Sequence, residues 1–115
     1  MDEIFESAAR SAGDMTGVFE FDGDTSYFYL YELNSVRGNK ILGAIQITSS
    51  PPKFAESDIA IEWCMDEEMV GFSVKGIIWA AFDCQNIEKF GGSYFEYGKP
   101  DIPAAVKEKF NRLQN

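Results

Sequence analysis

The sequence predicts an α+β fold, in which an antiparallel sheet of about six or seven strands runs in mostly meandering order between two terminal helices that pack on it. Three observations indicate this fold. Apolar and polar side chains alternate over several short stretches, as in half-buried strands. Residues typical of turns, mainly Gly, Asp, Asn and Pro, separate these stretches. Both ends of the chain instead have the apolar spacing of amphipathic helices.

Length and composition indicate a single domain over residues 1–115. The chain has 115 residues, of which 45% are hydrophobic, enough for one core. No apolar run approaches the roughly 20 residues that cross a bilayer. The acidic start at residues 1–6 is unlike the basic and then apolar pattern of a signal peptide. We therefore expect a cytoplasmic protein that does not bind membranes.

The clearest predicted element is a hairpin over residues 17–31, with a turn at 22–25. Gly23 tolerates a positive φ, and aspartate side chains can accept hydrogen bonds from nearby backbone amides. Because side chains alternate along a strand, the simplest register directs four apolar residues into the core. These are Phe19, Phe21, Phe28 and Leu30.

The same register leaves Tyr27, Tyr29 and Tyr31 in a row on the opposite face, beside Glu20. Tyrosine is amphipathic and enriched at interfaces, so the row is a candidate binding surface. Two structural explanations also fit. A helix could cover the row, or the hydroxyls could reach solvent from a half-buried sheet.

The remaining elements follow from local patterns. Gly43 and Ala44, on a predicted strand, leave room for another group to approach closely. In the hairpin of residues 69–84, pairing Val74 with Ile77 would place Phe72 opposite Trp79. Both faces of that hairpin are largely apolar, so a terminal helix should cover one of them. Helices are predicted over 2–11 and from Asp101 to Leu113, strands over 41–48, 58–64, 69–75, 77–84 and 93–97, and loops over 34–39, 49–56 and 85–92.

The net charge of −9 is unevenly distributed. Residues 1–32 hold eight acidic residues against Arg10 alone, and residues 56–68 hold six acidic residues and no basic one. Phosphate backbones are bound through Lys and Arg, so nucleic acid is excluded as an expected partner. A basic protein would be attracted electrostatically.

Few catalytic groups are present. The chain has no histidine, which removes histidine-based nucleophilic systems and metal sites. Cys64 and Cys84 are expected to be free, buried thiols. We therefore expect no enzyme activity and no cofactor, although a glycosidase-like pair of carboxylates remains open. Asp22 and Asp24, or the run Asp66, Glu67 and Glu68, could bind Ca²⁺ or Mg²⁺, but turn formation and solvation explain both clusters without a metal.

The segment Phe21-Asp22-Gly23-Asp24-Thr25-Ser26-Tyr27-Phe28-Tyr29 resembles the hairpin of a small bacterial family of uncharacterised function. Members of that family carry a Phe-x-Asp-Asp-Gly-Asp-Thr-Gly-Tyr-Phe-Tyr-type segment, from which Ser26 departs. The resemblance covers about residues 18–83. It implies a bacterial cytoplasmic domain of this size and supplies no activity.

Two functions are compatible with these features. The first is a binding or regulatory protein, similar to an immunity protein or inhibitor, that meets a basic partner through an acidic, tyrosine-rich surface. Its contacts would be Glu20, Tyr27, Tyr29, Tyr31, Asp66, Glu67 and Glu68. The alternative is a domain that binds a small ligand or divalent metal through its carboxylate turns. The tyrosine row could also be the interface of a homodimer.

Overall fold

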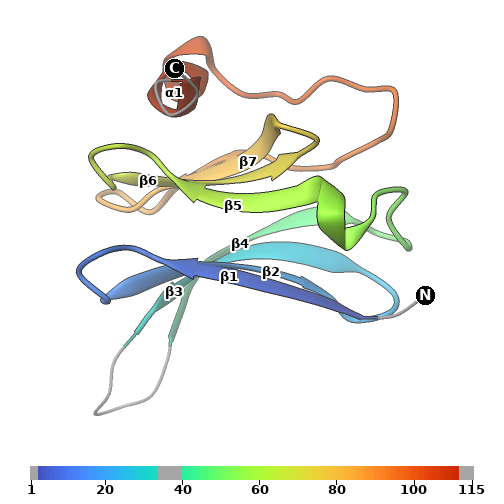
Figure 1. Cartoon of the computed structure of the whole chain (residues 1–115), viewed down its shortest axis with the longest axis horizontal. Coiled ribbons are helices and arrows are strands. Elements are labelled where there is room, and N and C mark those ends of the chain that lie inside the picture. The colour runs from blue at the N-terminus through green and yellow to red at the C-terminus, as the bar shows by residue number, and fades with distance from the viewer. Residues whose placement is uncertain (1–2, 34–39, 112–115) are drawn as a thin grey trace.

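The computed structural model describes residues 3–33 and 40–111, and over these residues the chain is almost entirely β-structure (Figure 1). The predicted loop at 34–39 and the predicted helix end at Leu113 lie outside the described residues. The elements are β1 (Ile4–Ala9), β2 (Met15–Phe21), β3 (Ser26–Glu32), β4 (Lys40–Thr48), the 3₁₀ turn η1 (Glu56–Asp58), β5 (Ile59–Trp63), β6 (Met69–Val74), β7 (Ile77–Asp83), β8 (Glu88–Gly91) and α1 (Ala104–Asn111).

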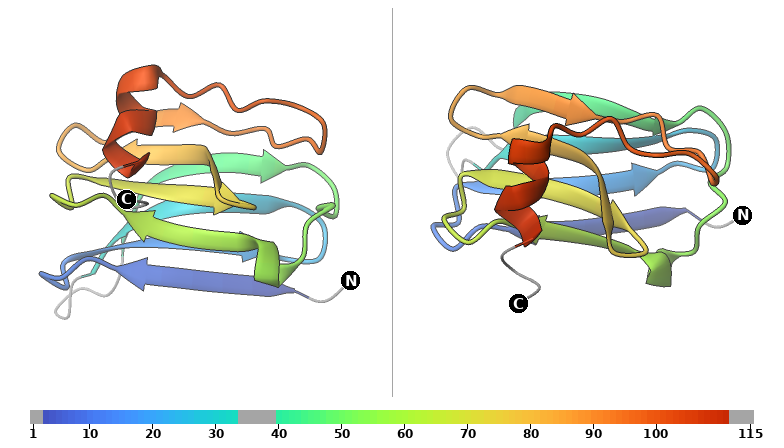
Figure 2. Two further views of the ribbon diagram at one scale, coloured as in Figure 1. Left: turned by 45° about the horizontal axis from the view of Figure 1, so that its top comes forward. Right: turned by 90° about the horizontal axis from the view of Figure 1, so that it is seen from above.

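The strands form two sheets of four, and each sheet is an antiparallel meander. Their orders are β1-β2-β3-β4 and β5-β6-β7-β8. The sheets stack face to face, and α1 lies on the far side of the second sheet (Figures 1 and 2). The antiparallel pairing and the C-terminal helix are thus confirmed, whereas the predicted single sheet and its six or seven strands are wrong. The chain crosses between the sheets after Thr48, where Pro51 and Pro52 cannot donate to a ladder.

The main core lies between the two sheets and is rich in phenylalanine. Phe19 of β2 stacks on Phe72 of β6 with ring centroids 4.6 Å apart. The predicted core face of the first hairpin is confirmed, since all four of its apolar side chains are fully buried. Phe54, which belongs to a predicted exposed loop, is also buried in this core and contacts Phe19.

The predicted N-terminal helix over 2–11 is wrong, because residues 4–9 form the edge strand β1. β1 pairs antiparallel with β2 from Ile4 opposite Phe21 to Ala9 opposite Thr16. Its apolar residues fit a helical stripe as well as a strand. The ladder offered by β2 therefore decides the conformation, as tertiary pairing often overrides local propensity.

The predicted strand over 93–97 is also wrong, and the eighth strand lies within the predicted loop at 85–92. β8 pairs with β7, and it ends where Gly91 and Gly92 adopt φ of 77° and 114°. The chain then returns towards the first sheet, where Tyr94 N–H donates to the carbonyl of Ile47 at 2.8 Å. These residues therefore bridge the two sheets.

The β6–β7 hairpin begins with the predicted pair of Val74 and Ile77, but a bulge next to Phe72 shifts the rest by one residue. Phe72 consequently faces Ala80, so the predicted pairing with Trp79 is wrong. The expected cover over the outer face is confirmed. It forms a second cluster whose members are Cys64, Met69, Ala81, Ile102, Val106 and Phe110.

Helix α1 spans eight residues and is the sole α-helix among residues 3–33 and 40–111. Within these ranges, no helix has the length and apolarity that crossing a bilayer would need.

Candidate functional site

The outer face of the first sheet carries the predicted tyrosine row. Side chains on neighbouring strands line up in three rows across the four strands, because the registers pair them directly. We call these twelve residues the tyrosine face. The rows are Phe5-Glu20-Tyr27-Gln46, Ser7-Val18-Tyr29-Ala44 and Ala9-Thr16-Tyr31-Ile41.

The three tyrosines form a continuous ladder of half-buried rings. The ring centroids of Tyr27 and Tyr29 lie 5.8 Å apart at an interplanar angle of 18°, so these rings are stacked. Tyr31 meets Tyr29 edge to face at 5.8 Å and 67°. Burial, followed by the nearby charge of Glu20, raises the pKa of Tyr29. The tyrosines are therefore fixed by one another, which lowers the entropy lost when a ligand covers them.

No element among the described residues lies over this face, since α1 packs on the opposite side of the sandwich (Figures 1 and 2). Of the two structural explanations for the tyrosine row, a covering helix is not found among residues 3–33 and 40–111. The other explanation, a half-buried sheet, is observed. An open hollow of about 420 Å³ crosses this face. Its lining residues are Phe5, Ser7, Ala9, Thr16, Val18, Tyr31 and Leu33.

Several members of the tyrosine face were missed by the sequence-based prediction. The most prominent are Phe5 and Ile41, whose side chains are 63% and 51% exposed. Phe5 was assigned to a helix, so its place opposite Glu20 could not be foreseen. Residues 4–9 do not alternate between apolar and polar side chains, so the local pattern gave no signal of a strand.

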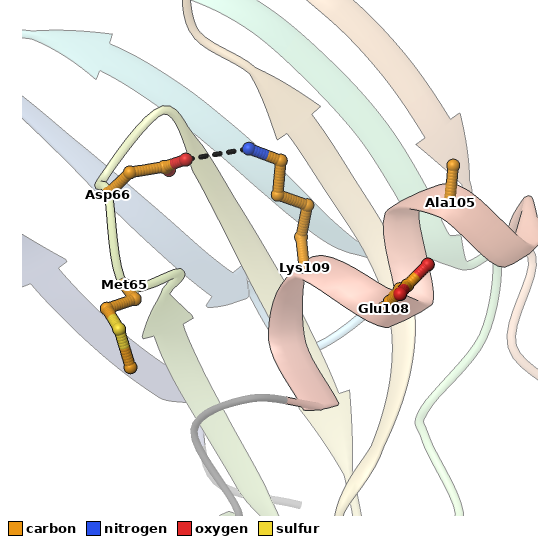
Figure 3. Close-up of a pocket in the computed structure, with 5 residues that line it drawn as sticks. All are labelled: Met65, Asp66, Ala105, Glu108 and Lys109. Atoms are coloured by element: carbon orange, nitrogen blue, oxygen red, sulfur yellow. Dashed lines mark hydrogen bonds and ion pairs between the residues drawn. The ribbon is translucent and has the colours of Figure 1, made fainter.

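The predicted acidic loop lies at one end of the sandwich, and its carboxylates have internal partners. Asp66 accepts hydrogen bonds from Cys64 Sγ at 2.9 Å, from the Glu68 backbone N–H at 3.0 Å and from Lys109 Nζ at 2.7 Å. These three contacts hold the pKa of Asp66 well below its usual range. Figure 3 shows the Asp66–Lys109 pair at the rim of a surface hollow of about 530 Å³.

Glu67 connects the same loop to the first sheet. Its carboxylate accepts hydrogen bonds from Ser11 N–H at 3.0 Å and Ser11 Oγ at 2.9 Å. Arg10, which pairs with Asp14 at 2.7 Å, also donates to the Glu67 carbonyl at 3.1 Å. The loop therefore joins the β1–β2 turn, the second sheet and α1, a role that the sequence did not reveal because the partners lie 43 to 57 residues away.

Asp22 and Asp24 lie in the β2–β3 turn. Asp22 Oδ1 accepts hydrogen bonds from the backbone N–H groups of Asp24 and Thr25, both at 2.9 Å, which is the expected chemistry of an aspartate turn. These two bonds lower the pKa of Asp22. Among the described residues, no group of three or more Cys, Asp or Glu side chains is arranged to hold a metal ion.

Both cysteines are free and buried, as predicted. Burial raises the pKa of Cys64, and it raises the pKa of Cys84 to about 11. Low thiolate content makes both side chains weak nucleophiles. The groups that the tyrosine face presents are aromatic rings and the exposed Glu20 carboxylate.

Comparisons with curated proteins and with solved structures found no match for this chain. Residues 2–109 match the family described as "Uncharacterized protein conserved in bacteria (DUF2251)". The expected membership in an uncharacterised bacterial family is confirmed, over more of the chain than residues 18–83. That the hairpin motif is the signature of such a family stays a prediction. Because the match spans most of its length, this chain belongs to that bacterial family.

Proposed function

We propose that this chain is a non-enzymatic binding protein that contacts another protein through the tyrosine face. The observation that supports this function is the difference between the two sheets. Helix α1 covers the outer face of the second sheet, where Phe110 reaches the backbone at Gly71. The outer face of the first sheet bears an ordered aromatic ladder with no cover from the described residues.

Interfaces are enriched in aromatic side chains and depleted of charged ones at their centre. The tyrosine face has this composition, since Glu20 is its single charged member. Three tyrosines and Phe5 supply large contact areas with few rotatable bonds. Such residues are the usual energetic centres of protein–protein contacts.

The electrostatics favour a basic partner. A net charge of −9 on 115 residues attracts a cationic protein and accelerates its association. An inhibitor of a basic target, similar to an immunity protein, would use both the charge and the aromatic face. Asp66, Glu67 and Glu68 contribute to this field, and a direct contact between them and the partner stays a prediction.

The test is affinity capture from a bacterium that encodes the protein, followed by mass spectrometry. Three tagged proteins are compared: the wild type, the triple variant Tyr27→Ser/Tyr29→Ser/Tyr31→Ser, and the matched control Tyr97→Ser. Tyr97 is 93% exposed and lies outside the tyrosine face, so its replacement removes an aromatic ring elsewhere on the surface. Circular dichroism and thermal melting first establish that each variant is folded.

We expect a basic protein in stoichiometric amount with the wild type and with Tyr97→Ser, and its loss with the triple variant. Equal capture by all three proteins would contradict the assignment of the surface. The absence of any stoichiometric partner of the folded wild type would contradict the proposed function itself.

A further inference from the structure

Glu20 occupies an unusual position at the edge of the aromatic ladder. Its strand partners are Phe5 on one side and Tyr27 on the other. The side chain is exposed, and among the described residues it has neither a hydrogen bond nor an ion pair. The remaining eleven residues of the tyrosine face are uncharged.

A carboxylate in this position limits what can cover the face. An apolar partner would remove water from Glu20 and leave a buried charge without compensation, which strongly opposes binding. A partner that presents a cation opposite Glu20 avoids this penalty. The face therefore selects for positive charge at one defined point.

We infer that the tyrosine face binds its partner protein through an arginine whose guanidinium pairs with the Glu20 carboxylate and stacks on the ring of Tyr27. This inference rests on the proposed function and names the chemistry of the partner. A guanidinium is planar, can bind a carboxylate through two parallel hydrogen bonds and packs well on aromatic faces. A lysine ammonium lacks the planar surface that the ladder of Tyr27 and Tyr29 complements.

The same charge argues against a second copy of this chain as the occupant. Two copies packed through this face would bury two Glu20 carboxylates, and none of the twelve residues supplies a cation. The net charge of −9 on each copy adds repulsion. A face that is otherwise suited to self-association is thus directed towards a foreign, arginine-bearing partner.

The test titrates the ¹⁵N-labelled protein with two capped tripeptides, Leu-Arg-Leu and Leu-citrulline-Leu. Citrulline keeps the planar shape of arginine but is neutral and has a carbonyl oxygen in place of one nitrogen, so the two peptides differ in charge and in that one hydrogen-bonding group. The proteins compared are the wild type, Glu20→Gln and the control Glu88→Gln. Glu88 is exposed on β8 of the other sheet, so the control removes an equal charge outside the face.

For the wild type and Glu88→Gln, we expect saturable amide shifts at Phe5, Glu20 and Tyr27, with the arginine peptide binding about five-fold more tightly than the citrulline peptide. In Glu20→Gln the two peptides should bind equally. Equal affinities for the wild type, a difference that survives in Glu20→Gln, or no saturable binding would each overturn the inference. The inference would also be overturned if sedimentation showed that the wild type is a dimer and that the Tyr29→Ser variant is a monomer.

The failure of this inference can be distinguished from that of the proposed function. If a captured partner binds Glu20→Gln and the wild type equally but is lost with the triple tyrosine variant, the tyrosine face is the interface and the arginine anchor is wrong. If the partner binds the triple variant as well, the proposed function fails.

Discussion

Lys109 Nζ lies 2.7 Å from Asp66 Oδ2, so helix α1 is tied to the β5–β6 loop by an ion pair. The same lysine lies 3.6 Å from Glu68 Oε2. The apolar residues of α1 pack on the second sheet, and this polar contact holds its C-terminal half to the end of β5. Helix α1 is thus held both by apolar packing on the second sheet and by an ion pair with the β5–β6 loop.

We expect Asp66→Asn to reduce stability at neutral pH and to lose this effect in acid. The folded protein lowers the pKa of Asp66, so between the folded and the unfolded pKa the unfolded chain binds more protons and stability rises with pH. The stabilisation is complete above about pH 5 and is lost as the pH falls further. Urea unfolding from pH 2 to pH 8 should show the two proteins converging in acid. A difference that is constant over this range would contradict the prediction.

Gly43 of β4 faces the ring of Phe82 of β7 across the space between the two sheets. A Cβ atom on Gly43 would lie 2.7 Å from Phe82 Cε1, and the phenyl ring is fully buried. We expect Gly43→Ala to destabilise the fold by about 1–3 kcal/mol, the usual cost of overpacking. Urea unfolding measures this, with the exposed Gln46→Ala on the same strand as the control.

A second variant separates overpacking from a general effect at this position. Because the inserted methyl group meets the Phe82 ring, Gly43→Ala/Phe82→Leu should be less destabilised than the sum of the two single changes. Strict additivity of the two changes would mean that the contact between the sheets is not what Gly43 provides.

Trp63 closes one side of the sandwich. Its Nε1–H donates to the Ala8 carbonyl at 2.8 Å, which links β5 to β1, and the Arg10 guanidinium lies 5.7 Å from its ring. We expect Trp63→Phe to cost about 1 kcal/mol of stability, because the donor is lost while an aromatic ring remains. Hydrogen exchange should accelerate selectively at β1 amides. Exchange that accelerates evenly over both sheets would contradict a local role.

The sequence correctly predicted which side chains of the first hairpin face the core, because the apolar residues of its two neighbouring strands must share one face. The alternation around Phe19 and Phe28 specifies one core face, because a slip of one residue would expose all the phenylalanines together. Gly43 was likewise identified as a point of close approach, since a glycine inside a strand often marks a place where another group comes near the backbone. The tyrosine row follows from the same alternation.

The wrong predictions have one physical origin. A local sequence pattern does not show which distant residues a segment will contact in the fold. Residues 4–9 form a strand only because β2 supplies a ladder. The bulge next to Phe72 shifted the pairing of Trp79, and no residue type near this position predicts a bulge. The internal contacts of Asp66 and Glu67 depend on Lys109 and Ser11, which the fold brings from distant positions.

The two cysteines should react slowly with thiol reagents in the native protein. Cys64 and Cys84 are 2% and 6% exposed, and burial raises the pKa of both. At pH 8 we expect a chromogenic aromatic disulfide reagent to detect little reaction over minutes, and two thiols per chain after unfolding in urea. Rapid native labelling of Cys64 would show that α1 separates readily from the second sheet, and rapid labelling of Cys84 would show that the two sheets separate readily from each other.

Tyr29 should ionise at a higher pH than free tyrosine, and Glu20 should be part of the reason. Burial is the largest cause of its raised pKa and the charge of Glu20 is the next. Proteins labelled with ¹³Cζ-tyrosine, with Tyr29→Phe for assignment, would follow the ring by NMR. Glu20→Gln should lower the pKa of Tyr29 part of the way, whereas the distant Glu88→Gln should leave it unchanged.

The raised pKa of Tyr29 also predicts how stability responds to alkali. The unfolded chain releases the tyrosine proton first as the pH rises, so the contribution of Tyr29 is complete below about pH 10 and is lost above it. Tyr29→Phe should therefore lose less stability than the wild type between pH 9 and pH 11. Identical alkaline profiles, together with an unshifted Tyr29 in Glu20→Gln, would mean that Glu20 and the tyrosine ladder are not electrostatically coupled.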